Sequence, residues 1–481
     1  MSIPNTQFTP HVSHDIHSGR GKRMAIIASY FSGESYGLLG PQMAATVIQE
    51  NTPYGCIVVA VTHEDDKTVL KKGLANYFGD ERPVIGFSTL SGREDLFALA
   101  RELKNADALT ILAGPQSDVD YVGEVGWKDY NYRFKGLAQH FSMALHGPAE
   151  QAIDLLKDLP LRKGGNIQGL LHLRKDHQVI QTQARGWDQR FLKEVHWENI
   201  YRVGDGGLVP LEIGSGQVLQ QIGCPYAARG GWVNIDDPVS VPGEVGQETR
   251  VFLKGCGFCD VAADKGFFGI LKTETVLSQI RCLPEGEDMR KIPFELINEN
   301  ALPTLPRLLT ACREQEVKLS QINLTLRADW FLRGEPWLRE ALKMAEHMGI
   351  RILLASVGFE SFDDTILRNL NKGLDVETNL RAVRLMRRLK REFPVQWAYS
   401  RGEGAIHGFI HPTPWDTDKT WENIQRVIAQ NGLPADILPD HSIPLIIHHA
   451  SGLGDWIRGV ETREGCRFGR HGSIIGWWKA M

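Results

Sequence analysis

The sequence predicts an α/β protein in which an N-terminal doubly wound parallel sheet is followed by a full or partial β/α barrel. Apolar runs of strand length alternate with helical patterns over residues 24–113, and the alternation returns over about residues 217–450. A loop-rich stretch with five glycines, 196–216, separates the two parts. The 481 residues leave room for two or three domains, and a composition of 42% hydrophobic and 23% charged residues is typical of a globular protein.

These patterns divide the chain into a polar leader, a first α/β domain, a linker with a small hairpin, a barrel and a C-terminal extension, over residues 1–23, 24–155, 156–216, 217–430 and 431–481. The two arms of the hairpin are expected at 167–173 and 178–183.

Charge and hydropathy exclude several classes of partner. The net charge of −4 gives no electrostatic reason to expect binding to nucleic acid or to an anionic membrane. The leader lacks the apolar core of a signal peptide, and no run of about 18 apolar residues occurs. Seven cysteines, an odd number, argue for ligands and bystanders instead of a disulfide framework. We therefore expect a cytoplasmic protein without a membrane span.

The first domain is expected to contain four strands with helices between them. The strands are predicted at 24–30, 55–61, 84–88 and 108–113, and the helices at 42–50, 67–78 and 93–103. Such sheets bind ligands at the carboxyl ends of their strands. This rule selects two turns of small residues, Ser88-Thr89-Leu90-Ser91-Gly92 and Ala113-Gly114-Pro115, which without other information are equally well explained as tight turns.

In the barrel, strands are expected at 294–298, 321–326, 350–357 and 405–410. One helix can open at Pro336 and close at Gly349, and another covers 379–393. Functional groups of barrels lie at the carboxyl ends of the strands. The residues selected in this way are Cys256 and Cys259 after 250–253, Arg327 and Asp329 after 321–326, Glu360 and Ser361 after 350–357, and His411 after 405–410.

Cys256 and Cys259 form a Cys-x-x-Cys pair beside glycines, in the run VFLKGCGFCDVAADKGFFG. This spacing brings two sulfur atoms onto one metal ion or cluster, and the glycines let the backbone wrap closely around it. An iron–sulfur cluster, a zinc site, a redox dithiol and an inert pair all remain open on the spacing alone.

Further along the chain, the pattern becomes specific. From about residue 24 to 430, the sequence resembles the cobalamin-binding radical S-adenosylmethionine (SAM) proteins. The likeness rests on the segments LKGCGFCDV, TLRAD (325–329), VGFESFDDTILRNLNKG (357–373) and GFIHPTPWDTDKTWENI (408–424). The third resembles the family's G-x-E-S … L-x-x-x-N-K-G block over seventeen residues and is the strongest support. The fourth has His411-Pro412 where a glycine is usual.

The resemblance implies that the first domain is a flavodoxin-like cobalamin domain. Ser88, Leu90, Gly114 and Pro115 occupy the places of the two turns that receive the nucleotide tail, and HGPAE (146–150) resembles the small turn that follows them. The Asp-x-His-x-x-Gly signature of histidine-ligated cobalt is absent from the loop SYFSGESYGLLG. The resemblance therefore implies a cobalt without a histidine ligand from the protein.

The cysteine spacing departs from the family's Cys-x3-Cys-x2-Cys loop. The nearest upstream cysteine is Cys224 in IGCPY, which gives Cys-x31-Cys-x2-Cys. We interpret 225–255 as an insertion between the first and second cluster ligands, because a [4Fe–4S] cluster needs three thiolates in space and sets no sequence gap. In the alternative, Cys224 is a packed thiol and the cluster is lost or incomplete. Cys282 and Cys312 are expected to be core residues.

By resemblance, Cys224, Cys256 and Cys259 hold the cluster. The Phe258 backbone would lie near the adenine of SAM, Glu360 and Ser361 near its ribose or amino group, and Arg327 near its carboxylate. An alternative for Glu360 is an ion pair with Arg327 or Lys372.

The implied activity is reductive cleavage of SAM to a 5′-deoxyadenosyl radical, with methylation of an unactivated carbon. The alternatives are a radical cyclase or rearrangement enzyme, and a corrinoid-binding carrier or sensor with a degenerate cluster loop. An electron donor such as flavodoxin or ferredoxin is the implied partner, and the substrate, a small molecule or a peptide, stays unassigned.

Overall fold

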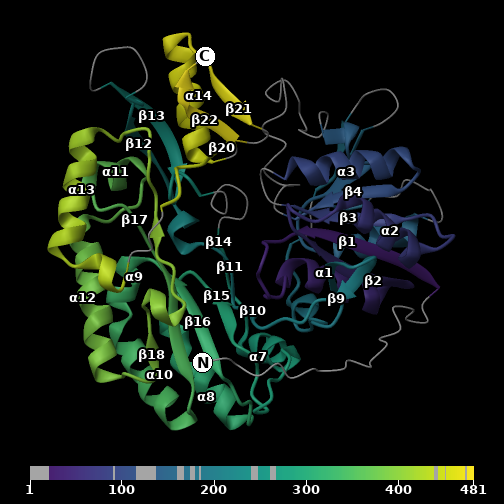
Figure 1. Ribbon diagram of the computed structural model, residues 1–481, viewed down its shortest axis with the longest axis horizontal. Helices are drawn as coiled ribbons and strands as arrows, with labels where there is room; N and C mark the ends of the chain where they lie inside the picture. The colour runs from purple at the N-terminus through teal and green to yellow at the C-terminus, as the bar shows by residue number, and fades with distance from the viewer. Residues whose placement is uncertain are drawn as a thin grey trace.

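The computed structural model describes residues 21–89, 93–114, 137–159, 167–173, 179–183, 186–239, 247–259, 267–437, 442–449, 451–471 and 474–480. Two α/β bodies lie side by side, one N-terminal and one central, and the C-terminal elements lie against the top of the central body (Figure 1). Among the described residues, no helix has the length and apolar character needed to cross a membrane.

The N-terminal body contains a nine-stranded sheet in the order β7-β6-β5-β4-β3-β1-β2-β8-β9. Its parallel strands are β1 (Lys22–Ser29), β2 (Tyr54–Val61), β3 (Val84–Ser88), β4 (Leu109–Ala113), β5 (Met143–Leu145) and β8 (Ile200–Gly204). The helices are α1 (Leu39–Asn51), α2 (Lys67–Phe78), α3 (Glu94–Asn105) and α5 (Gln151–Asp158).

Helices cover both faces of this sheet, because its strands are apolar on both sides. Along β1, Ala25 and Ile27 belong to one buried cluster, while Met24 and Ile26 belong to another on the opposite face. Strand order reverses at β1, which lies between β2 and β3. The predicted doubly wound sheet is thereby confirmed, and its switch point lies at the carboxyl ends of β1 and β3.

The segment expected to be a linker contributes to the same sheet. The predicted hairpin is present as β6 (Leu170–Leu173) and β7 (Val179–Gln181), and β6 pairs antiparallel with β5. On the opposite edge, β8 pairs with β2, and β9 (Gly207–Pro210) pairs with β8. Residues 156–216 therefore do more than connect two bodies. Periodicity did not reveal this because β8 and β9 are short and glycine-rich.

The central body is a partial β/α barrel. Its strands lie in the order β10 (Gly216–Leu219), β15 (Phe294–Ile297), β16 (Gln321–Leu326), β17 (Arg351–Glu360) and β18 (Trp397–Ala398), and β19 (Gly408–Phe409) pairs with the end of β17. All these pairs are parallel. The helices are α7 (Thr273–Cys282), α8 (Leu305–Glu314), α9 (Ala328–Arg333), α10 (Glu335–Met348), α11 (Asp364–Asn369), α12 (Val376–Glu392) and α13 (Asp418–Gln430).

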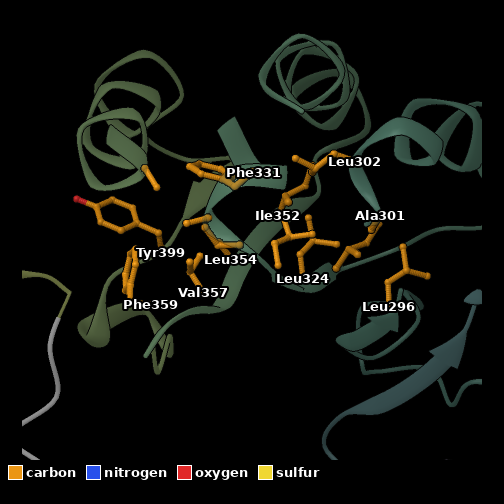
Figure 2. Close-up of a cluster of buried hydrophobic side chains, with 14 of the residues drawn as sticks. Leu296, Ala301, Leu302, Leu324, Phe331, Ile352, Leu354, Val357, Phe359 and Tyr399 are labelled. Atoms are coloured by element: carbon orange, nitrogen blue, oxygen red, sulfur yellow. The ribbon is translucent and has the colours of Figure 1, made fainter. Parts of the chain in front are cut away.

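One face of the barrel sheet packs on these helices and the other is polar. Leu324, Ile352 and Leu354 enter the apolar cluster with Phe331 (Figure 2). The alternate residues of β16, Gln321, Asn323 and Thr325, are only partly buried. This alternation places polar side chains on the concave face, where the carboxyl ends of the strands meet.

Smaller elements surround the barrel. Two antiparallel pairs are formed by β11 (Gln221–Gly223) with β14 (Phe267–Ile270) and by β12 (Gly230–Asp236) with β13 (Glu248–Lys254). The C-terminal elements are β20 (Ile447–His448), α14 (Gly452–Glu464), β21 (Phe468–His471) and β22 (Ile474–Ala480). Short 3-10 helices are η3 (Leu137–Gln139), η4 (Gln189–Leu192), η5 (Pro225–Ala228), η6 (Leu302–Thr304), η7 (Arg401–Glu403) and η8 (Leu433–Ala435).

Candidate functional site

Two of the predicted site residues lie at the carboxyl ends of barrel strands, whereas Cys256 and Cys259 follow β13, which pairs antiparallel with β12 and is not the barrel strand that the sequence predicted at 250–253. Arg327 directly follows β16, and Glu360 is the last residue of β17. Nη1 of Arg327 donates to Sγ of Cys256 over 3.4 Å, and its Nη2 donates to the carbonyl of Lys372. Nζ of Lys372 lies 2.9 Å from Oε1 of Glu360. A cysteine, two cations and a carboxylate thus form one connected cluster.

Arg327 is buried between aromatic rings. Its guanidinium lies 4.0 Å from the ring centre of Tyr226 and 5.3 Å from that of Trp330. Its Nε donates to Asp329 over 3.2 Å. Together with the contacts to Cys256 and Lys372, this uses three of its five N–H donors. The arginine is therefore held rigidly beside the Cys256 sulfur.

Glu360 and Lys372 form a buried ion pair, with side chains only 12% and 5% exposed. The ion pair with Lys372, one of the two alternatives that the sequence left open for Glu360, is therefore present. Glu360 has a left-handed backbone with φ of 59°. A methyl group on Gly358 would stand 2.5 Å from Oε1 of Glu360 and 2.7 Å from Nζ of Lys372. A side chain at 358 would therefore displace the paired ends of Glu360 and Lys372.

Ser361 is completely buried behind Glu360. Its hydroxyl accepts a hydrogen bond from the Asp363 backbone N–H over 3.2 Å. The side-chain amide of Asn379 donates to the carbonyls of both Phe359 and Ser361, over 3.1 and 3.0 Å. Ser361 and Asn379 thus fix the course of the chain that presents Glu360.

The loop that carries Cys256 and Cys259 is fixed from two sides. The N–H of Cys259 donates to the carbonyl of Cys256 over 3.2 Å, which closes a tight turn. Gly257 donates its N–H to Leu370 over 2.8 Å and accepts from the N–H of Leu453 over 2.8 Å. Between the two cysteines, the half-buried ring of Phe258 lies 5.9 Å from Nζ of Lys372.

Residues 371–373 hold the two separate cysteine segments together. Nδ2 of Asn371 donates to the carbonyl of Gly255, which precedes Cys256, over 2.7 Å. The hydroxyl of Tyr226, two residues after Cys224, donates to the carbonyl of Asn371 over 3.0 Å. Gly373 has φ of 69°, and a side chain there would collide with the Tyr226 hydroxyl. The Asn-Lys-Gly sequence is therefore the structural joint of the site.

Cys224 immediately precedes η5, and it is close enough to Cys256 for the charges of the two thiolates to interact. Burial raises the pKa of the Cys224 thiol, and charges on Glu299 and Cys256 raise it further. Hydrogen bonds from the backbone N–H groups of Tyr226 and Ala227 act in the opposite direction. Between the two cysteines the chain forms the β12–β13 hairpin, in which Gly230 lies opposite Lys254. The hairpin therefore brings the chain that follows Cys224 back beside the chain that precedes Cys256.

Burial also raises the pKa of the Cys256 thiol, and the positive charges of Lys372 and Arg327 oppose this shift. Within the described ranges, no three His, Cys, Asp or Glu side chains converge on a point that would suit a single metal ion. A [4Fe–4S] cluster bonds each thiolate to a different iron, so its ligands need not converge in that way.

Glu299 is a site residue that the sequence reasoning missed. Burial raises its pKa, while the charges of Lys372 and Arg327 lower it. Oε1 of its neighbour Glu295 accepts from Thr325 over 3.1 Å, on the concave face. The position of Glu299, two residues after β15, was the available signal, since the same rule selected Arg327 and Glu360.

In the N-terminal body, the two selected turns meet beside the switch point. Ser88 ends β3 opposite Ala113 at the end of β4. Gly114 has φ of 77°, and a methyl group on it would stand 2.8 Å from the Ser88 hydroxyl. Oγ1 of Thr89 is buried and has no hydrogen-bond partner among the described residues. Leu90 and Pro115, also selected from the sequence, lie outside the described residues.

The remaining residues that the sequence singled out form contacts of their own. The His411 ring stacks on Trp421 with 3.7 Å between ring centres, and its Nδ1 lies 3.1 Å from Oδ2 of Asp416. Cys312 is fully buried in α8, and Cys282 packs against the same core at the end of α7. The prediction that these two cysteines are core residues is confirmed.

Comparison with known proteins shows which solved structures share this fold. No protein-family model matches the sequence, and no curated protein matches it. Several solved structures do match. One is the cobalamin-dependent S-adenosylmethionine radical enzyme OxsB with aqua-cobalamin and S-adenosylmethionine bound, at 14% identity and a TM-score of 0.57, over 92% of this chain and 62% of that chain.

Two further OxsB structures agree. The aqua-cobalamin form gives 14% identity and a TM-score of 0.56, over 95% of this chain and 64% of that chain. The apo, selenomethionine-labelled form gives 13% identity and a TM-score of 0.57, over 94% of this chain and 64% of that chain. This chain thus spans somewhat less than two thirds of the length of the chains it matches. It has the fold of a cobalamin-dependent radical SAM enzyme, with a doubly wound N-terminal body and a partial β/α barrel.

Proposed function

We propose that this protein is a cobalamin-dependent radical SAM enzyme that uses a [4Fe–4S] cluster on Cys224, Cys256 and Cys259 to cleave SAM reductively. The observation that carries the proposal is the joint at 371–373, where the Tyr226 segment and the Gly255 segment are both hydrogen-bonded to one residue, Asn371. A packed, bystander Cys224 would not require its chain to be tied to the Cys-x-x-Cys loop. The cofactors named for the OxsB structures, cobalamin and SAM, support the same assignment.

The residues present suit such a cluster. When bound, a cluster with three protein thiolates leaves one iron open to chelate SAM and supplies the electron that cleaves its sulfonium to methionine and a 5′-deoxyadenosyl radical. Arg327 and Lys372 place two positive charges beside Cys256 and favour its thiolate form. Leu453 packs against Gly257 and holds the loop in place, while Cys256 and Cys259 are only partly buried.

The same residues are expected to orient SAM. The Phe258 backbone would lie against the adenine, and Glu360 and the backbone at Ser361 would receive the ribose or amino group. Arg327 retains two N–H donors beyond its contacts with Asp329, Cys256 and Lys372, and would direct them at the carboxylate of SAM. Lys372 holds the Glu360 carboxylate in place, so that it can accept hydrogen bonds from the ligand without reorganising.

The N-terminal turns are expected to receive cobalamin. The unpartnered Thr89 hydroxyl, the Ser88 hydroxyl and the open Gly114 turn form a small polar cradle, which Leu90 and Pro115 would complete. Bound cobalamin would supply methyl transfer to a carbon radical. Methylation of an unactivated carbon is the reaction we propose, and the substrate is a small molecule or a peptide.

We expect the intact, anaerobically reconstituted protein to release 5′-deoxyadenosine from SAM when dithionite is added, because the cluster site and the SAM contacts are complete without a substrate. Product is measured by chromatography with mass detection. A methyltransferase would also form S-adenosylhomocysteine when its substrate is present, since SAM then serves as methyl donor too. A cyclase or rearrangement enzyme would give 5′-deoxyadenosine alone. A preparation with full iron, sulfide and corrinoid that releases neither product would refute the enzyme assignment.

Gly114→Ala is expected to weaken cobalamin binding by about tenfold or more. The new methyl group would press on the Ser88 hydroxyl, and the positive φ costs about 1–2 kcal/mol for a residue with a Cβ. Gly206→Ala is the matched control, because Gly206 has φ of 88° but no atom within 4 Å of its Cβ position. Absorbance titration of the full chain measures the affinity. Equal affinities for the two variants would place cobalamin elsewhere.

A further inference from the structure

The β12–β13 hairpin, which lies between Cys224 and Cys256 in the sequence, has one covered face and one exposed face. Ile235, Val251 and Leu253 point inward and are at most 6% exposed. The N-terminus of α14 packs on this side, where a methyl group on Gly452 would collide with Leu253. In Figure 1, the C-terminal elements lie against the hairpin. The inner face is therefore part of the core.

The outer face carries two large aromatic side chains. Trp232 and Phe252 are directly opposite each other in the register and are 62% and 46% exposed. Their ring centres are 5.7 Å apart with an interplanar angle of 71°. Phe252 lies over Gly230, where a side chain would collide with its ring. Exposed, mutually ordered aromatic rings of this size are typical of protein interfaces.

Two cations lie on the same outer face. Arg250, Phe252 and Lys254 alternate along β13, so all three side chains point outward. The guanidinium of Arg250 lies 5.2 Å from the ring centre of Trp232. Neither Arg250 nor Lys254 forms an ion pair with another described residue. We call Trp232, Arg250, Phe252 and Lys254 the basic aromatic patch.

The acidic residues of the hairpin lie at its other end. Asp236 and Glu248 are opposite each other, at the end remote from Cys256. Asp236 is paired with Arg368, and the next residue, Asp237, is paired with Arg463. Glu248 alternates with Arg250 along β13 and is exposed on the same face, but it lies at the far end of the strand, so the surface around Trp232 and Phe252 is locally positive on a chain whose net charge is −4.

The patch lies close to the cluster site because it is joined to it covalently. Lys254 is two residues before Cys256 and Phe252 is four residues before it. An extended chain rises at most ~3.6 Å per residue, so the Cα atoms of Phe252 and Cys256 are within about 14 Å of each other. A protein that docks on the patch would therefore bring its own surface next to the cluster loop.

We propose that the basic aromatic patch is the docking site for an acidic electron-donor protein that carries a low-potential flavin or iron–sulfur centre. The inference rests on the proposed function. One electron passes from the donor to the cluster of this chain, so that the donor is oxidised and the cluster reduced by one electron each, and no bond forms or breaks in this step. Charge complementarity selects the partner, because the only unpaired charges beside the aromatic rings are positive among the residues described.

The probe for the test is an acidic flavodoxin, and the protein is the full-length holoenzyme. The charge-reversal variant Arg250→Glu/Lys254→Glu is expected to raise the Kd for flavodoxin by about tenfold or more at low ionic strength, because two attractive contacts become repulsive. Trp232→Ala, an exposed substitution without charge change, is expected to weaken binding as well. The matched control is Lys318→Glu/Lys343→Glu, which reverses two exposed lysines of the barrel far from the cysteine loop.

A second readout separates this proposal from the proposed function. With dithionite as reductant, the patch variants should release 5′-deoxyadenosine at the wild-type rate, whereas with reduced flavodoxin their rate should fall in parallel with binding. Unchanged flavodoxin affinity in the patch variants would overturn the docking site. Self-association of the wild-type protein that the patch variants abolish would overturn it in favour of a second copy. Failure of the proposed function would instead show as no cleavage with dithionite in the wild type.

Discussion

Cys224→Ala is expected to remove the cluster as completely as Cys256→Ala or Cys259→Ala. Anaerobic reconstitution of the wild type should give about four irons per chain with matching sulfide, and each variant should fall to background. The reason is tertiary, since Tyr226 and Gly255 are both bound to Asn371 and so place the two cysteine segments together. Iron and sulfide analysis and the near-ultraviolet charge-transfer absorbance measure the result.

Cys282→Ala and Cys312→Ala are the controls, because both cysteines pack in the core away from the loop. They should keep full iron. If Cys224→Ala retains the cluster and cleaves SAM, then the β12–β13 hairpin is not an insertion between two ligands. Native protein that holds stoichiometric zinc without sulfide would contradict the cluster itself.

The second large effect is expected at Lys372. Lys372→Met should destabilise the barrel by about 3–5 kcal/mol, because it leaves the Glu360 carboxylate buried and uncompensated. Burial raises the pKa of the neighbouring Glu299 and the charge of Lys372 opposes this shift, so a second carboxyl would lose a compensating positive neighbour. The free energy of unfolding of the barrel is followed in urea by far-ultraviolet circular dichroism and tryptophan fluorescence.

Arg384→Met offers a matched control, because Arg384 pairs with Glu377 on the surface with both side chains about 60% exposed. Exposed pairs add little to stability, so this variant should stay close to wild type. The double variant Glu360→Gln/Lys372→Met should recover much of the loss, since it removes the buried charge together with its partner. A small effect for Lys372→Met alone would mean that water reaches Glu360 and that the pair is not truly buried.

Elements with strong local signals were predictable from the sequence. The strand predicted at 321–326 is observed as Gln321–Leu326, because its alternation of polar and apolar residues reports the two faces of a sheet. The helix expected from Pro336 to Gly349 is observed as Glu335–Met348, and Gly349 closes it with φ of 63°. These features depend on contacts between residues close in the chain.

The sequence by itself thus determined the two parallel sheets, the Cys256–Cys259 turn and the residues at the ends of the barrel strands. Only the tertiary structure decided which distant segments complete them. It added β8 and β9 to the first sheet, brought the Cys224 segment to the Cys256 loop through residues 371–373, and laid Leu453 of α14 on Gly257. Each of these contacts joins residues far apart in sequence through a single hydrogen bond or a buried face. Local periodicity does not identify such partners, because it indicates only which side of an element is buried and not which residues cover it.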